Sequence, residues 1–333
     1  NEEWISDKTR FCYIDSNLNN RVMNPEVKRF SNSLWKQQKD ESEKFWLSSN
    51  ASQLWWMWDA FEIPTQRNSS YTSWETCLWI IKLMFNSSQN KNLTGLYSTN
   101  NNLESLSSFK YLFNSLGSSK IGFEKNYLTD TSFSKMFRFN STLKNISDSD
   151  FCLLIGINPR YEGSALNIAL RKRYLEGNFE IASIGVTNNL TYPVTHVDTG
   201  LKSFFKIIEG RHSLCKKLLK SKKPTIILSA GIFKRFDMAN VHSALELLSS
   251  YSSVNIRNWK GINILQNDSN HTGSLELGSN YLDNYTLSKS RIVYSLNTEE
   301  LSTKIRLNSF YSYFKKKDYF HVITQGYASN NTI

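Results

Sequence analysis

The sequence predicts an α/β protein in which parallel strands are flanked by helices, with two units of this kind in tandem. Short apolar runs alternate with segments of helical periodicity, which is the pattern of strand–helix–strand units. Some of these runs stop at glycine before a helix-forming stretch, as strands do where the chain turns. With 333 residues, of which 40% are hydrophobic, the chain is long enough to bury the cores of two domains.

The beginning of the chain lacks this alternation. Residues 1–30 are predicted to be irregular, with Pro25 as a break, and residues 31–68 to be an insertion rich in tryptophan. A cluster such as Trp55, Trp56 and Trp58 could stack on a ligand. We expect it instead to pack against the rest of the domain or a neighbouring subunit, because a soluble surface seldom exposes so much aromatic area.

The first α/β unit is predicted over residues 69–149. Its first helix opens at Ser73-Trp74-Glu75, with Thr72 or Ser73 as the N-cap, and runs to Asn86. Two strands and one helix follow; the strands are expected at 93–97 and 120–124, and the helix at 102–116, before Gly117.

The second α/β unit is predicted over residues 150–333 and is expected to be incomplete at its C-terminus. Its apolar runs indicate strands at 150–157, 180–186, 224–228, 291–296 and 320–324. The segments between them predict helices at 164–175, 201–209, 213–221, 241–251 and 298–314. Where the first of these strands ends, Gly156 leads into Asn158-Pro159-Arg160, and a strand that feeds a helix N-terminus in this way is a usual place to hold a phosphate.

The net charge of +11 raises the question of nucleic-acid binding. The basic clusters, among them Lys220-Ser221-Lys222-Lys223, fall near predicted helix C-termini, where cations stabilise the helix dipole. No RNA-binding signature accompanies them. The longest apolar run, Cys77 to Phe85, contains Lys82 and is too short to cross a membrane. The chain starts without Met or an apolar leader, and we expect it to be a piece of a longer polypeptide.

Cysteine and histidine are too scattered to predict a metal or catalytic site. The four cysteines form no C-x-x-C pair, and we expect buried free thiols in a reducing compartment. The five histidines lie far apart, and none combines with a carboxylate and a nucleophile at a recognisable spacing. They are His196, His212, His242, His271 and His321.

Several stretches resemble one protein family. The opening WISDKTRF, the segment Tyr71-Thr72-Ser73-Trp74-Glu75 and the run LLIGINPRYEGSALNIALRKRYLEG are similar to the large iron-sulfur subunit of respiratory complex I, NADH:ubiquinone oxidoreductase. The similarity lies with its molybdopterin-oxidoreductase-like region, covers most of residues 1–230 and continues more weakly to Gly326. The resemblance implies tandem Rossmann-like sheets of the formate dehydrogenase type. It also implies that residues 1–30 lead from a missing iron-sulfur region.

The resemblance also bears on the glycine turn. Relatives that carry the cofactor contact a pterin guanine dinucleotide through a G-x-N-P turn, and a second strand ends in a loop with Asp and Arg that holds the other phosphates. Here the second loop is Thr187-Asn188-Asn189-Leu190, which has neither. We therefore interpret Gly156, Asn158, Pro159 and Arg160 as a vestigial pterin-site turn that binds no cofactor. No catalytic residue and no metal ligand is predicted in this chain.

The function implied is a non-redox, structural and assembly-supporting part of the complex I subunit, on the matrix side of the mitochondrial inner membrane. The iron-sulfur clusters are expected in the missing or separate N-terminal part, which is also the expected partner together with other matrix-arm subunits. A composition rich in Asn, Lys and Ile is common in organellar genomes and favours an organelle-encoded chain. Two alternatives remain: an active molybdopterin-dependent oxidoreductase and a basic, RNA-associated mitochondrial protein.

Overall fold

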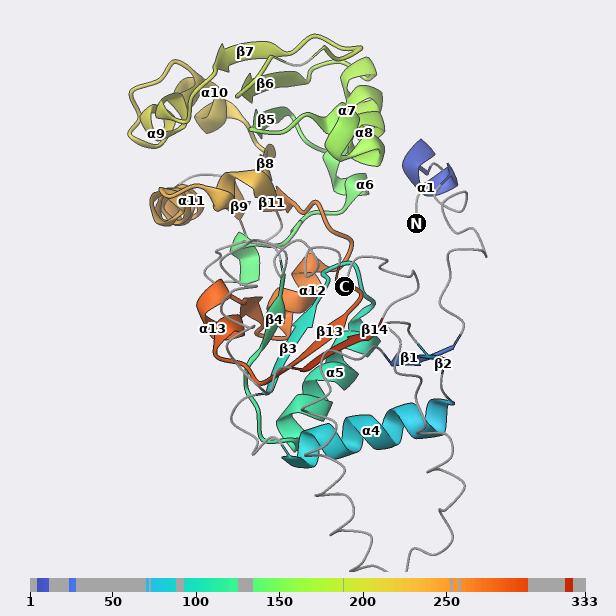
Figure 1. The fold of residues 1–333 in the computed structure, drawn as a ribbon. Coiled ribbons are helices and arrows are strands. Elements are labelled where there is room, and N and C mark those ends of the chain that lie inside the picture. Colours follow the sequence, from blue (N-terminus) through green and yellow to red (C-terminus); the bar gives the residue numbers. More distant parts are fainter. Residues whose placement is uncertain are drawn as a thin grey trace, which may run out of the picture. The chain divides into compact units, whose positions relative to one another are not determined.

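The computed structural model describes residues 5–11, 24–27, 70–71, 73–87, 93–124, 134–187, 189–251, 254–256, 259–298 and 321–325. The predicted insertion at 31–68 and the predicted helix at 298–314 lie outside these residues, apart from Thr298. The chain forms two compact units (Figure 1). The first unit comprises residues 1–15, 99–104 and 125–281, and the second comprises residues 16–98, 105–124 and 282–333.

The first unit is built on a five-stranded parallel sheet. Its strands are β5 (Phe151–Ile155), β6 (Glu180–Ile184), β7 (Thr195–Asp198), β8 (Pro224–Ser229) and β11 (Ile262–Leu265). The sheet order is β11-β8-β5-β6-β7, and every neighbouring pair is parallel. The chain thus starts in the centre, builds outwards through β6 and β7, and then crosses to the other side of β5, which is one half of a Rossmann-type fold.

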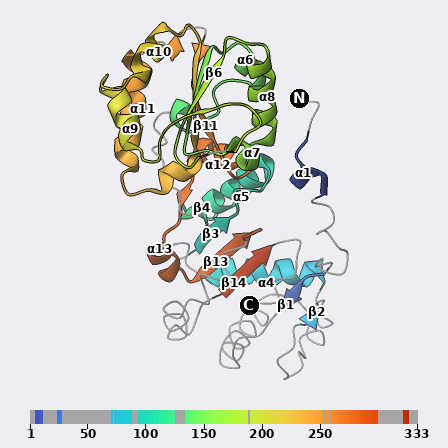
Figure 2. The same cartoon turned by 90° about the horizontal axis from the view of Figure 1, so that it is seen from above.

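Helices cover both faces of this sheet, as Figure 2 shows. One face carries α6 (Leu143–Ile146), α7 (Pro159–Glu162) and α8 (Ser164–Leu175), and the other carries α9 (Lys202–Ile208), α10 (Leu214–Lys220) and α11 (Met238–Tyr251). All residues of β5 and β8 are buried, because covered parallel strands are apolar on both sides. Leu154 and Ile227 of the sheet meet Leu166 and Leu170 of α8 in the core.

The second unit contains four parallel strands in the order β4-β3-β13-β14. Their bounds are Leu93–Tyr97 for β3, Ile121–Phe123 for β4, Ile292–Leu296 for β13 and His321–Gln325 for β14. Helices α4 (Trp74–Ser87) and α5 (Leu103–Ser115) both reach Tyr294 of β13, through Phe85 at 6.4 Å and Phe109 at 5.4 Å between ring centroids.

The remaining described elements are short. They are α1 (Asp7–Phe11), β1 (Glu26–Val27), β2 (Ser70–Tyr71), the 3-10 turns η5 (Ser134–Met136) and η6 (Ala230–Lys234), β9 (Asn255–Ile256), β10 (Trp259–Lys260), α12 (His271–Glu276), β12 (Asn280–Tyr281) and α13 (Asn284–Ser288). No helix among the described residues combines the length and the hydropathy that a membrane crossing requires.

The two units are not the consecutive ones, 69–149 and 150–333, that the sequence predicts. Strands β13 and β14 were assigned to the second α/β unit at 150–333, but β13 pairs with β3, so Ile292 lies beside Leu93. The chain leaves the sheet of β3 and β4, builds the whole of the other sheet, and then returns. Consecutive strands are neighbours in most α/β folds, and sequence order alone does not reveal such a return.

Candidate functional site

The site singled out by the sequence lies at the carboxyl edge of the first sheet, where the strand order reverses. Strand β5 is the centre of the sheet and has β6 on one side and β8 on the other. The loop after β5 leads to α7 and α8 on one face, whereas the loop after β8 leads through η6 to α11 on the other face. In open α/β sheets this switch point is the usual location of a bound ligand.

Gly156 follows the last residue of β5 and takes the left-handed conformation, with φ of +60°. Its N–H donates to the carbonyl of Ile184 in β6 at 2.8 Å. A Cβ at this position would lie 3.0 Å from Cδ1 of Ile232, which is closer than van der Waals contact. Gly185, with φ of +128°, ends β6 beside it, and a Cβ there would lie 3.2 Å from Cα of Gly156. The two strand ends are packed backbone against backbone.

Asn158 begins α7 and Glu162 completes its cap. The Asn158 side chain accepts from the Arg160 N–H at 3.2 Å, and the Glu162 carboxylate accepts from the Asn158 N–H at 2.9 Å. This pairing resembles a capping box in which the acidic residue stands one position further along the helix. Pro159 occupies the first helical position, where its missing N–H costs nothing.

The same carboxylate reaches across the switch point. Its second oxygen accepts from the Ser229 hydroxyl at 2.8 Å, and Ser229 is the last residue of β8. Glu162 therefore joins the loop after β5 to the loop after β8. The sequence pattern predicted a role for Gly156, Asn158, Pro159 and Arg160 but not for Glu162 and Ser229. The spacing of Asn158 and Glu162 was a visible signal for the cap, whereas the contact with Ser229, 67 residues away, was not.

Several backbone N–H groups at this edge donate hydrogen bonds to other groups of the chain. Each of the following donates to a carbonyl or side-chain oxygen of the protein: Gly156 to Ile184, Asn158 to Glu162, Arg160 to Asn158, Gly185 to Asp198 and Gly231 to Ser229. The exposed guanidinium of Arg160 donates to the carbonyl of Asn189 at 3.2 Å, so it spans from α7 to the loop after β6. This contact joins the turn after β5 to the loop after β6.

Three ionisable groups of this sheet and its loops have shifted pKa values. Hydrogen bonds from the Ser203 hydroxyl, and then from the Gly200 and Thr199 N–H groups, lower the pKa of Asp198 at the end of β7. Burial raises the pKa of the Cys152 thiol in β5 and that of the Tyr192 hydroxyl, which keeps both groups protonated at neutral pH. Cys152 is buried, whereas Cys77 and Cys215 are half-buried free thiols.

The histidines are dispersed over different elements. His196 of β7 contacts the carbonyl of Gly185 at 2.9 Å, His212 accepts from the Leu214 N–H at 3.1 Å, and His242 of α11 stacks near Phe233. Within the described residues, no three His, Cys, Asp or Glu side chains gather as metal ligands would.

One histidine does lie near a carboxylate, which the sequence did not suggest. Nδ1 of buried His271 is 3.9 Å from Oδ2 of Asp268, and that oxygen also accepts from the Thr99 hydroxyl at 2.6 Å. The Asn270 N–H donates to the Thr99 carbonyl at 3.0 Å, so the cluster fixes the loop that follows β3. The Thr99 hydroxyl donates a hydrogen bond to the carboxylate, and this contact ties the loop after β3 to Asp268.

Fold and switch point together define a parallel α/β protein of the Rossmann type. The sequence matches the family described as Molybdopterin oxidoreductase over residues 21–333, and the chain belongs to that family. It is 33% identical over 324 residues to the NADH-ubiquinone oxidoreductase 75 kDa subunit of Reclinomonas americana, a match that covers 90% of this chain and 41% of that protein. These findings confirm the predicted fold class and the predicted resemblance.

Two further relatives carry related names. The chain is 30% identical to the mitochondrial NADH-ubiquinone oxidoreductase 78 kDa subunit of Candida albicans, over 91% of this chain and 38% of that protein. It is 24% identical to the mitochondrial NADH dehydrogenase [ubiquinone] iron-sulfur protein 1 of Solanum tuberosum, over 91% of this chain and 36% of that protein. The chain spans about two fifths of the length of the curated relatives it matches.

Proposed function

We propose that this chain is the non-redox, structural part of the large iron-sulfur subunit of mitochondrial complex I, the enzyme that transfers electrons from NADH to ubiquinone. Its role is to support assembly of the matrix arm by bracing the segment that carries the iron-sulfur clusters. Its partners are that segment and other matrix-arm subunits, on the matrix side of the inner membrane. The observation that carries the proposal is the similarity to complex I subunits along nine tenths of the chain.

The switch point supports the non-redox part of the proposal. A pterin guanine dinucleotide carries a pyrophosphate, which needs several converging N–H donors and cations. Here the N–H groups of Gly156, Asn158 and Arg160 already donate within the chain. The Glu162 carboxylate bridges Asn158 and Ser229 across the crevice and brings a negative charge that would repel a phosphate. The residues present do not fit a pterin guanine dinucleotide, and the turn instead joins the loop after β5 to the loop after β8.

The experiment that tests the proposal is affinity isolation of the chain from mitochondria, followed by mass spectrometry and elemental analysis. We expect complex I subunits to accompany the chain and molybdenum to be far below one atom per chain. A stoichiometric amount of molybdenum would favour the second candidate function, an active molybdopterin-dependent oxidoreductase, which the family membership makes the relevant competitor. Isolation of the chain without any complex I subunit would contradict the assignment itself.

A further inference from the structure

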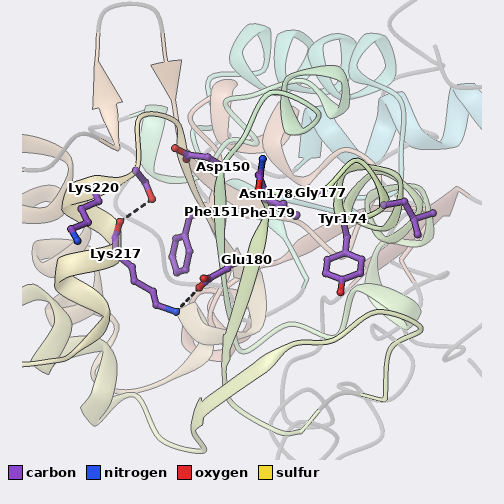
Figure 3. A pocket seen from close by; sticks show the side chains of 11 residues that line it. Asp150, Phe151, Tyr174, Gly177, Asn178, Phe179, Glu180, Lys217 and Lys220 are labelled. Atoms are coloured by element: carbon purple, nitrogen blue, oxygen red, sulfur yellow. Dashed lines mark hydrogen bonds and ion pairs between the residues drawn. The ribbon is translucent and has the colours of Figure 1, made fainter.

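A hollow of about 700 Å³ lies at the opposite, amino edge of the first sheet. It is formed where β5 and β6 begin, between the C-terminal ends of α8 and α10. Buried Phe151 and Phe179 line it together with Tyr174, while Leu175 is 73% exposed at its side. Figure 3 shows Lys217 and Lys220 on the α10 side of this hollow. Leu219, which stands between Lys217 and Lys220 in α10, is 72% exposed.

The walls of the hollow are held in place by specific contacts. Arg173 donates to the carbonyls of Ser149 at 2.7 Å and Gly177 at 2.8 Å, and its guanidinium lies 5.2 Å from the ring centroid of Phe179. On the other side, the Asp150 carboxylate accepts from the N–H groups of Lys222 at 2.6 Å and Lys223 at 3.1 Å. A hollow with fixed walls loses little entropy when a partner is bound.

The charges around the hollow are unbalanced. Two acidic residues line the hollow, Asp150 and Glu180, and two more, Asp148 and Glu176, stand in the segments that form it. All four are engaged: Asp148 with Lys223, Asp150 with backbone N–H groups, Glu176 with Arg173, and Glu180 with Lys217. Of the exposed lysines in these segments, Lys220 lines the hollow, and Lys172, Lys216 and Lys222 stand within two residues of a lining residue. None of these four has an acidic partner among the described residues. The dipoles of α8 and α10 account for part of this excess, but Lys222 lies beyond the end of α10.

We propose that this hollow docks an acidic segment of a partner protein, which inserts an apolar side chain beside Leu175 and Phe179 and places carboxylates against the four lysines. The charge argues for an acidic partner, and the apolar lining with an exposed leucine argues for an anchor side chain. RNA would satisfy the lysines but would leave the leucine without a role. The surface itself follows from the geometry of this chain; that the partner is a complex I subunit rests on the proposed function.

The test is zero-length carbodiimide crosslinking of native extracts that contain the full-length protein, because this reagent joins a lysine amine to a carboxylate in direct contact. We expect amide crosslinks from Lys172, Lys216, Lys220 or Lys222 to Asp or Glu of one polypeptide. Co-isolation of that polypeptide should fall roughly five- to tenfold with Lys220→Glu, and should also fall with Leu175→Ser. The control is Lys234→Glu, an exposed lysine at the carboxyl edge of the same sheet, which should leave co-isolation unchanged.

Two results would overturn the inference. One is the absence of carboxylate crosslinks at these lysines while other lysines of the chain crosslink normally. The other is recovery of RNA at this face, shown by ultraviolet crosslinking and by loss with Lys220→Glu, without a protein partner. The identity of the crosslinked polypeptide is a separate readout: a partner from outside complex I would contradict the proposed function and leave the docking inference standing.

Discussion

Replacing Gly156 should destabilise the fold through two separable effects. At φ of +60°, any residue with a Cβ costs about 1–2 kcal/mol relative to glycine. The Cβ would also lie 3.0 Å from Cδ1 of Ile232, and moving that side chain from its rotamer costs about 0.5–1.5 kcal/mol. Because valine is β-branched and fits the left-handed region poorly, Gly156→Val should lower the free energy of unfolding by about 2–4 kcal/mol.

Gly177 provides a matched control. It also has a positive φ, +85°, but a Cβ there meets nothing within 4 Å. Gly177→Val should therefore carry the backbone cost alone, and urea unfolding of both variants measures the difference. Equal destabilisation by the two changes would refute the packing argument. A Gly156→Val protein that folds and assembles normally yet abolishes electron transfer would refute the structural role of the turn.

Three further predictions concern single side chains. Glu162→Ala should lower the free energy of unfolding by about 1–2 kcal/mol in urea titrations, since it removes the cap and the bridge to Ser229. Glu162→Gln should lower the free energy of unfolding by less, and an equal decrease in both variants would contradict the bridging role. Because the pKa of Asp198 is lowered in the folded state, its stabilisation is present above the ordinary carboxyl pKa and is lost as pH falls through the folded value. Asp198→Asn should thus flatten the acid limb of a stability–pH curve, and an unchanged slope would count against this. Burial and the raised pKa should protect Cys152 from iodoacetamide until unfolding, while half-buried Cys215 should react before Cys152 does; native labelling of Cys152 would show that β5 is not a covered strand.

The local elements of the first sheet could be predicted because their residues carry the information themselves. The run FCLLI of β5 is apolar throughout and is buried throughout. The helix predicted at 164–175 matches α8, which lies between Gly163 and Gly177. The turn at Gly156 was recognisable because glycine alone accepts its conformation without strain.

Other features depend on partners far away in the sequence. Strand β11 was missed because Asn263 interrupts its apolar pattern; this asparagine is fully buried and accepts from the N–H and hydroxyl of Ser141, 122 residues earlier. Strand β7 was missed because its first two residues, Thr195 and His196, are polar and exposed at the edge of the sheet. Its sequence therefore lacks the alternation of apolar and polar residues that indicates a strand. The bridge from Glu162 to Ser229 follows from the strand order, which local patterns do not encode.

We propose that this chain contributes contacts, and not electrons, to complex I. The most direct measurement is the abundance of assembled complex on native gels after removal of the region, alongside NADH:ferricyanide activity normalised to flavin. We expect fewer assembled complexes, with the normalised rate of the remaining complexes little changed. Full abundance with a collapsed normalised rate would contradict it and would identify a catalytic domain where we propose a structural one.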